Sequence, residues 1–128
     1  MVDVQSLLTV KDLIKDEPVF VKFDSTVLAV AKKMKKNKVD NMLVKGSSGN
    51  VEGIVTNLDI VYKIVAKDAS PSKTEVKEIM TKNLLSIDGN ESMFMARQMM
   101  LDNKVSHLVV TNNEKQIGIV TSKEVLGK

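Results

Sequence analysis

An internal repeat constrains this 128-residue chain more than any other feature of its sequence. Residues 10–14 (VKDLI) align with residues 76–80 (VKEIM), about 66 positions further on. After one residue of slippage in a loop, residues 53–56 align with residues 118–121, and both segments read GIVT. Because the glycine and the threonine recur in a fixed order with apolar positions between them, we interpret the chain as a tandem duplication.

The repeat predicts how the chain is divided. We place the first repeat with its lead-in at residues 1–69, a linker at residues 70–73 and the second repeat at residues 74–128. The linker is assigned where Pro71 and small polar residues interrupt a helical stretch.

The hydrophobic pattern predicts the same order of elements in both repeats. In the first repeat we expect a strand at 19–21, a helix from 27, a hairpin of strands 41–44 and 51–55, and a helix over 58–67. In the second repeat we expect a strand at 84–87, a helix over 91–102, strands at 107–111 and 117–120, and a helix from 123. Such a β-α-β-β-α unit leaves one face of its sheet uncovered, so the two copies are expected to pack sheet to sheet in an α+β fold.

The first long helix shows this pattern most clearly. Val27, Val30, Ala31 and Met34 repeat at i, i+3, i+4 and i+7, which predicts one buried stripe. The lysines between them are then directed to solvent. The preceding residues 24–26 (DST) offer side chains that can cap the helix.

Composition excludes several classes of function. The chain has no cysteine and one histidine, His107, so we expect neither a metal site nor thiol catalysis. We find no catalytic signature and no glycine-rich phosphate loop, and therefore predict that the protein is not an enzyme.

The eight methionines suit the filling of a core. The sequence has no apolar run of membrane-spanning length and no signal-peptide pattern, so we expect a cytoplasmic protein.

Nucleic-acid binding is a weaker alternative. The formal net charge is only +3, and three phenylalanines and one tyrosine supply few platforms on which bases could stack. A lysine-rich stretch at residues 32–38 keeps the alternative open, although exposed lysines usually serve solubility.

The segment that follows the second hairpin strand carries the most informative polar residues. It reads GIVTNLD at residues 53–59 and GIVTSKE at residues 118–124. The strand ends and a helix begins at Thr56, so we expect Thr56 to cap the helix and the free N–H groups of its first turn to attract phosphate. Asp59 can accept hydrogen bonds from both hydroxyls of a ribose. Capping alone is the competing interpretation, and the recurrence in both repeats favours a functional one.

These residues resemble the CBS motif, the repeat first defined in cystathionine β-synthase, and the tandem resembles the pair known as a Bateman module. The Gly-h-h-Thr-x-x-Asp pattern at 53–59 and the valines that open residues 10–14 and 76–80 carry the resemblance. The resemblance implies a pseudo-twofold pair with two clefts between the motifs. Those clefts can bind adenosine-containing ligands such as AMP, ADP, ATP or S-adenosylmethionine.

The resemblance also implies which residues contact the ligand. Thr56 and Thr121 are expected to contact phosphate or ribose, and Asp59 and Glu124 the ribose hydroxyls. The adenine is expected beside the lead-in and the residues that open the second strand, namely Ile14, Met80, Val39, Asp40, Val105, Ser106 and His107.

The two clefts are expected to differ. Glu124 replaces the usual aspartate, and Asp40 repels a phosphate that Ser106 and His107 tolerate. The family's proline in the second strand is replaced by Met42 and Leu108. For His107 an ordinary position at a strand edge remains the alternative.

We therefore interpret the chain as a sensor of adenosine-containing metabolites that passes its signal to an effector chain or to its own oligomeric state. The alternative is a scaffold that binds no ligand and serves dimerisation or docking. The predicted helices carry more apolar residues than one buried stripe requires, which suggests a homodimer. The surplus residues are Leu28, Leu58, Val61, Ile64, Val65 and Phe94. The competing interpretation is that these side chains close the core within the chain.

Overall fold

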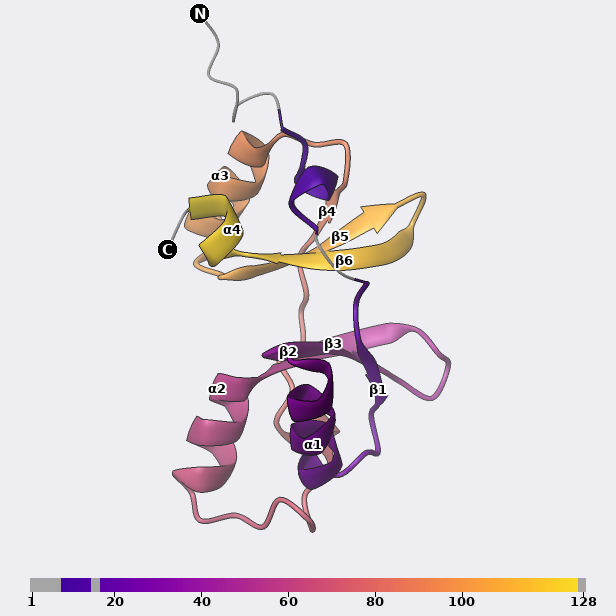
Figure 1. Ribbon diagram of the computed structural model, residues 1–128, viewed down its shortest axis with the longest axis vertical. Helices are drawn as coiled ribbons and strands as arrows, with labels where there is room; N and C mark the ends of the chain where they lie inside the picture. The colour runs from indigo at the N-terminus through magenta and orange to yellow at the C-terminus, as the bar shows by residue number, and fades with distance from the viewer. Residues whose placement is uncertain (1–7, 15–16, 127–128) are drawn as a thin grey trace, which may run out of the picture. The chain divides into compact units, whose positions relative to one another are not determined.

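The computed structural model describes residues 8–14 and 17–126, and it divides into two compact units. The first unit is Val19–Leu84. The second unit combines Leu85–Lys128 with Met1–Pro18. Figure 1 traces the elements of each unit along the chain.

The first unit contains one three-stranded sheet. Its strands are β1 (Phe20–Lys22), β2 (Asn41–Lys45) and β3 (Val51–Thr56), in the order β1-β2-β3. Strand β1 runs parallel to β2, and β2 runs antiparallel to β3. The helical segments are α1 (Val27–Asn37), α2 (Asn57–Ile60), the π-helical turn η3 (Val61–Val65) and the 3-10 turn η4 (Val76–Glu78).

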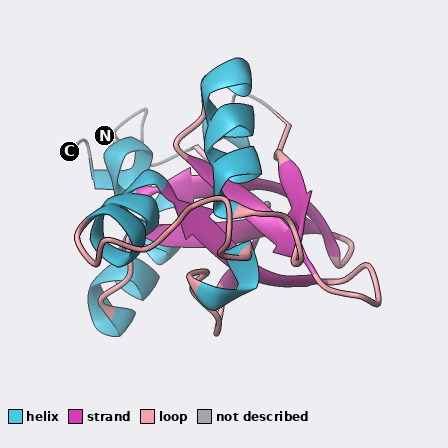
Figure 2. Cartoon of the chain, turned by 90° about the horizontal axis from the view of Figure 1, so that it is seen from below, coloured by secondary structure: helices cyan, strands magenta, loops and turns pink. Residues whose placement is uncertain are grey.

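The second unit repeats this topology. Its strands are β4 (Ser86–Asp88), β5 (His107–Asn112) and β6 (Lys115–Thr121), in the order β4-β5-β6. Its helical segments are η2 (Val10–Leu13), α3 (Met93–Asn103) and α4 (Ser122–Leu126). The predicted mixed α+β class is thus confirmed, with two three-stranded sheets and the helices that accompany them (Figure 2).

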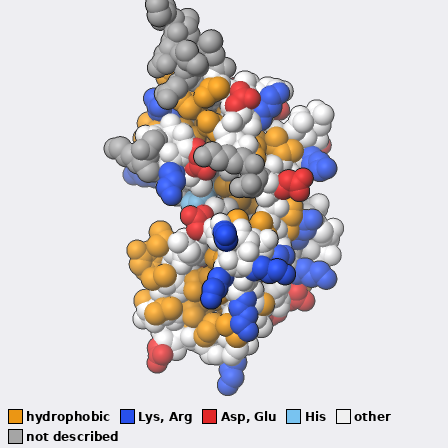
Figure 3. All heavy atoms as spheres, viewed as in Figure 1, with side chains coloured by type: hydrophobic (Ala, Val, Ile, Leu, Met, Phe, Trp, Pro, Cys, Tyr) orange, Lys and Arg blue, Asp and Glu red, His pale blue; other side chains and the backbone are white. Residues whose placement is uncertain are grey.

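Helix α1 forms where the sequence pattern places it. The Thr26 side chain caps it by accepting a hydrogen bond from the backbone N–H of Ala29 at 3.1 Å. Val27, Val30 and Met34 are buried on one stripe. The lysines of the helix are exposed, and Figure 3 shows basic side chains gathered over α1.

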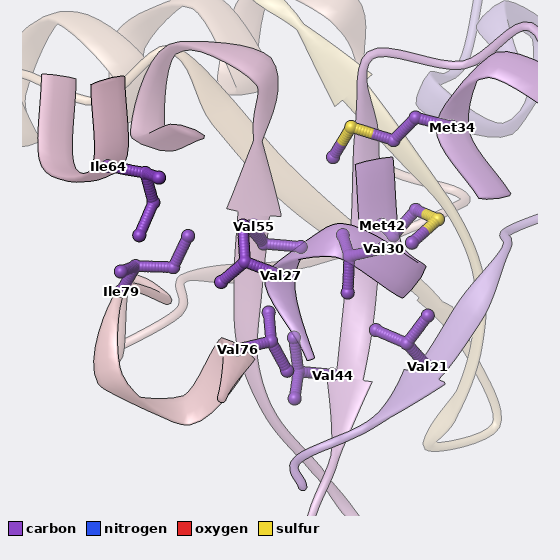
Figure 4. Packing of buried hydrophobic residues seen from close by; sticks show 10 residues of the cluster. All are labelled: Val21, Val27, Val30, Met34, Met42, Val44, Val55, Ile64, Val76 and Ile79. Atoms are coloured by element: carbon purple, nitrogen blue, oxygen red, sulfur yellow. The ribbon is translucent and has the colours of Figure 1, made fainter. Parts of the chain in front are cut away.

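The core of the first unit lies between its sheet and its helices. Side chains from α1 meet alternate residues of the strands, Met42 and Val44 on β2 and Val55 on β3 (Figure 4). This spacing follows from the period of two in a strand. The intervening residues Leu43 and Ile54 are also buried, so β2 and β3 have buried apolar residues on both faces.

Each core is completed by a lead-in segment from the other sequence repeat. The N–H of Val76 donates to the carbonyl of Ser25 at 2.8 Å, and Val76 is fully buried in the core of the first unit. In the same way the N–H of Val10 donates to the carbonyl of Glu91 at 2.8 Å, and Val10 is fully buried in the second unit. The boundaries of the compact units therefore differ from those of the sequence repeats, because each lead-in belongs to the unit of the other repeat.

The second helix of the first repeat differs from the continuous α-helix expected over 58–67. One α-turn is followed by a π-turn, in which the N–H of Ala66 reaches the carbonyl of Val61 at 2.9 Å. Ile64, which we grouped with the surplus apolar residues, is only 2 % exposed and belongs to the core. Val61 and Val65 remain exposed, as expected for a surplus apolar face.

The lead-in of the second unit yields a pH-dependent prediction. The Asp12 carboxylate accepts hydrogen bonds from the backbone N–H and the hydroxyl of Thr9, both at 2.9 Å. These bonds, the backbone one first, hold the pKa of Asp12 below its usual value. We expect Thr9→Val to raise this pKa by removing the hydroxyl, while the backbone N–H still keeps it below the usual value. A carbon NMR titration of the carboxyl group measures both values.

The sign of the linked stability follows from this direction. Because the folded state binds the proton more weakly than the unfolded state, the stabilisation is present above the unfolded pKa of Asp12. It is lost as the pH falls through the folded pKa. An Asp12 that titrates at its ordinary value in the folded protein contradicts the capping interaction.

Candidate functional site

The predicted cap at the start of α2 is present. The Thr56 hydroxyl accepts from the N–H of Asp59 at 3.2 Å, and the N–H of Thr56 donates to Oδ2 of Asp59 at 2.9 Å. The Thr56 hydroxyl also donates to Oδ2 at 3.2 Å. This reciprocal pair is a capping box, which fixes both side chains at the end of β3.

The expectation of free N–H groups in this first turn is wrong. The N–H of Asn57 donates to the carbonyl of Asp40 at 2.9 Å, and the N–H of Leu58 to the Asn57 side chain at 3.0 Å. The N–H of Asp59 is bonded to Thr56. Since all three amides have partners within the chain, this helix start offers a phosphate no unpaired backbone donor among them.

Lys63 is a further part of this junction that the motif did not identify. Its ammonium group forms an ion pair with Oδ1 of Asp59 at 2.9 Å and donates to the carbonyl of Ile79 at 2.8 Å. The side chain of Asp59 is only 11 % exposed. The i, i+4 spacing of Asp59 and Lys63 could have indicated this pair from sequence.

The second unit repeats the junction with different side chains. The N–H of Thr121 donates to Oε2 of Glu124 at 3.2 Å, and the Thr121 hydroxyl is bonded to the same oxygen. The N–H of Ser122 donates to the carbonyl of Ser106 at 2.9 Å, as Asn57 does to Asp40. His107 is opposite Thr121 in the sheet, and its Nδ1 lies 3.0 Å from the Ser106 hydroxyl.

The two recurring glycines make room for the lead-in segments. A Cβ atom on Gly53 would lie 2.6 Å from Sδ of Met80, and one on Gly118 would lie 2.8 Å from Cγ2 of Ile14. Both distances are too short for real contacts, so only glycine permits this approach. Beside Gly53, Ile54 and Thr81 exchange two backbone hydrogen bonds at 3.0 and 2.8 Å.

The structure thus brings the predicted residues together as two sets. In the first unit Met80 lies against Gly53, and Asp40 is bonded through its carbonyl to the turn that holds Thr56 and Asp59. Val39 precedes Asp40 and packs against the core. In the second unit the corresponding set is Ile14, Val105, Ser106, His107, Thr121 and Glu124.

The first set combines a hydrogen-bond acceptor, the Asp59 carboxylate, with the apolar side chains of Met80 and Val39. Each carboxylate oxygen of Asp59 has two lone pairs. Oδ2 uses both on Thr56, and Oδ1 uses one on Lys63. Asp59 therefore has one free lone pair. It can accept hydrogen bonds from two ligand hydroxyl groups only if one of its contacts with Thr56 or Lys63 breaks.

Neither a cluster of metal-ligating side chains nor a membrane-spanning helix occurs among residues 8–14 and 17–126 that the structure describes. No group of three or more histidine, cysteine, aspartate or glutamate side chains there could hold a metal ion. Within the same residues, no helix has the length and apolar character needed to cross a membrane.

Residues 10–66 and 76–128 each match the CBS domain. The chain belongs to the CBS domain family. The two matches begin at the lead-ins and include both capping junctions, so the family assignment rests on nearly the whole chain. A tandem pair of this kind is a regulatory module, which agrees with the predicted class of function.

Relatives and solved structures support the assignment. CBS domain-containing protein CBSCBSPB2 of Arabidopsis thaliana is 30% identical over 112 residues, which are 88% of this chain and 21% of that protein. The chain thus spans about a fifth of the length of this relative. A CBS-domain containing protein from Agrobacterium tumefaciens is 25% identical, with a TM-score of 0.83 and coverage of 99% and 97% of the two chains.

A hexameric CBS-CP12 protein from bloom-forming cyanobacteria has the same fold. Its TM-score is 0.84 at 24% identity, over 94% of this CBS chain and 71% of that one. This likeness confirms the predicted CBS fold and shows that the fold occurs in a higher oligomer.

The close approach of Ile14 to Gly118 in the second CBS unit can be tested by a double-mutant cycle. We expect Gly118→Ala to lower the free energy of unfolding by about 1–3 kcal/mol, because the new Cβ meets the stiff Ile14 side chain. Adding Ile14→Ala should recover at least about 1 kcal/mol relative to the sum of the single effects. Urea unfolding measures each term.

Leu13→Ala serves as the control for this cycle. Leu13 lies in the same lead-in and packs against the same core, but it is not among the nearest neighbours of a Cβ on Gly118. Its effect should add to that of Gly118→Ala within about 0.5 kcal/mol. Additivity in both pairs would show that Ile14 does not occupy the space above the glycine.

Proposed function

We propose that this CBS-pair protein is a cytoplasmic metabolite sensor that binds an adenosine-containing ligand and catalyses no reaction. The observation that carries the proposal is the recurrence, in both units, of a Thr-x-x-acid junction in which the threonine N–H and hydroxyl bond to the carboxylate. In both units this junction is also bonded to the segment that opens the neighbouring strand. AMP, ADP, ATP and S-adenosylmethionine are the candidate ligands. The absence of cysteine fits a reducing compartment.

In the first unit, Asp59 is the proposed acceptor for the ribose hydroxyls. Its remaining lone pair on Oδ1 accepts one hydroxyl, and release of Lys63 frees a second position on the same oxygen. Met80 and Val39 supply the apolar surface against which adenine packs. Thr56 positions Asp59 through the capping box and offers its hydroxyl to the ligand.

The two units are proposed to differ in the ligand charge that they accept. Asp40 is exposed beside the first junction, where its negative charge opposes a polyphosphate. This favours S-adenosylmethionine or AMP over ATP in the first unit. Ser106 and His107 beside the second junction carry no such negative charge, so that unit suits a more highly phosphorylated ligand.

Ligand binding tests the proposal. We expect at least one of AMP, ADP, ATP and S-adenosylmethionine to give saturable binding in isothermal titration calorimetry. Asp59→Asn keeps an acceptor for the cap but removes the charge and one acceptor oxygen, and it should weaken binding in the first unit by about tenfold or more.

Thr26→Ala is the matched control for local damage. It removes the cap of α1 in the same unit, away from the junction, and costs about 1 kcal/mol of stability. Its ligand affinity should equal that of the unsubstituted protein. No measurable binding of any of the four ligands would refute the sensor and leave a scaffold role. An equal loss of ligand affinity in the Asp59→Asn and Thr26→Ala variants would do the same.

The proposed output is a change in a homodimer that associates through exposed apolar helix residues. Leu58, Val61, Tyr62 and Val65 gather on α2 and η3, where Figure 3 shows hydrophobic side chains, and Val65 is 70 % exposed. Exposed apolar surface of this kind marks association sites. Leu28, Phe94, Met95 and Leu101 are exposed on the other helices.

The dimer is testable by sedimentation. Val65→Glu places a charge on the apolar surface of η3 and should weaken self-association by about tenfold or more. Ser47→Glu introduces the same charge in the exposed turn of the β2–β3 hairpin and should leave association unchanged. Analytical ultracentrifugation over a range of concentrations checks both. A monomer at every concentration would contradict the proposed dimer.

A further inference from the structure

The first unit contains a pocket that the proposed ligand site does not use. It has a volume of about 380 Å³ and lies between β1, the start of α1 and the end of β2. Phe20 and Ala29 contribute accessible apolar lining, whereas the neighbouring Val21 and Val30 are buried. The volume falls within the range of small-molecule sites, about 300–1,000 Å³.

Three lysines line this pocket, and no acidic residue does. Lys33 donates to the carbonyl of Phe20 at 2.7 Å, and the Lys45 ammonium lies 4.2 Å from the centroid of the Phe20 ring. Among the residues that the structure describes, neither these two nor Lys22 forms an ion pair with a carboxylate. No ion pair within residues 8–14 and 17–126 therefore neutralises the positive charge around the pocket.

Two of these lysines are direct neighbours in the sheet. Lys22 and Lys45 are register partners in the parallel pair of β1 and β2. Like charges in such a position destabilise a sheet. An anion bound between them removes this repulsion.

The second unit shows that the fold does not require the lysines. Asp88 and Thr111 occupy the register positions of Lys22 and Lys45 there, and Met99 occupies the position of Lys33 on the equivalent helix. A structural requirement of the β-α-β-β-α unit would appear in both copies. The lysine pocket is a property of the first unit alone.

The pocket also differs in position from the capping junction. Lys45 is the last residue of β2, whereas Asn41, which pairs with Thr56, is the first. The four residue steps from Asn41 to Lys45 separate the two ends by roughly 13 Å. One adenosine ligand at the junction does not account for the pocket.

We propose that the pocket lined by Lys22, Lys33 and Lys45 is a second binding site, for a small organic phosphate with an apolar body. The ammonium groups bind the phosphate, and the aromatic or aliphatic part of the ligand packs against the side chains of Phe20 and Ala29. The site binds its ligand whether or not the junction binds a nucleotide.

A proton–nitrogen NMR titration of the full chain with phenyl phosphate tests this site. We expect saturable shifts at the amides of residues 20–22, 29–33 and 45. Inorganic phosphate, which lacks the apolar body, should bind at least about tenfold more weakly. AMP serves as a second phosphate ester, and its shifts show whether it enters this pocket or the junction at residues 56–59.

Paired substitutions separate the pocket from general surface charge. Lys33→Gln with Lys45→Gln should weaken phenyl phosphate binding by about tenfold or more. Lys32→Gln with Lys36→Gln removes the same charge from exposed positions outside the pocket and should change binding by less than about twofold. Lys22→Gln, a single exposed substitution, provides a second test if the first pair disturbs the fold.

Three results would overturn the proposal. The first is no saturable shift at the pocket residues, which would leave the lysines as protection of the exposed edge strand β1. The second is equal binding of phenyl phosphate and inorganic phosphate. The third is an equal loss of affinity in the two lysine pairs.

Discussion

The structure depends on backbone hydrogen bonds between each lead-in segment and the unit formed mainly by the other sequence repeat. Val76 and Lys77 donate to the carbonyls of Ser25 and Phe23, as Val10 and Lys11 do to the equivalent loop. Val10 and Val76 are fully buried, and each contributes about 1.5–3 kcal/mol through burial. A single sequence repeat lacks the lead-in that completes its own sheet and helices, which gives a physical reason for the tandem.

The geometry of the capping junction follows from the same exchange. The segment after η4 lies against β3 because Thr81 pairs with Ile54 and Gly53 leaves space for Met80. Lys63 then links Asp59 to the carbonyl of Ile79 in this segment. A ligand that draws Asp59 away from Lys63 therefore loosens a contact with the lead-in itself. Under the proposed sensor function, this contact is the route by which a bound ligand would alter the segment that leads into the second unit.

The sequence predicts the elements better than their connections. The 3.6-residue spacing of Val27, Val30 and Met34 and the period of two in the strands locate the main helices and both hairpins, because burial imposes those periods. Each lead-in segment could pack against either of two similar units. Hydrophobic periodicity does not show which unit it joins. The π-turn at η3 and the paired amides of Asn57 and Leu58 depend on tertiary contacts. The capping residues were predicted correctly, but the satisfaction of these amides was not.

Comparison of the two copies separates positions that the fold constrains from positions that are free to vary. The glycine and the threonine recur in both. Each glycine leaves space for a lead-in side chain, and each threonine bonds to the carboxylate three residues later. The charged positions do not recur, since Asp40 is replaced by Ser106 and the pair Lys22 and Lys45 by Asp88 and Thr111. Two copies with the same topology share the main folding constraints, so differences of charge at equivalent positions are free to serve recognition. The electrostatic difference between the units is therefore the feature from which separate ligand preferences should be sought.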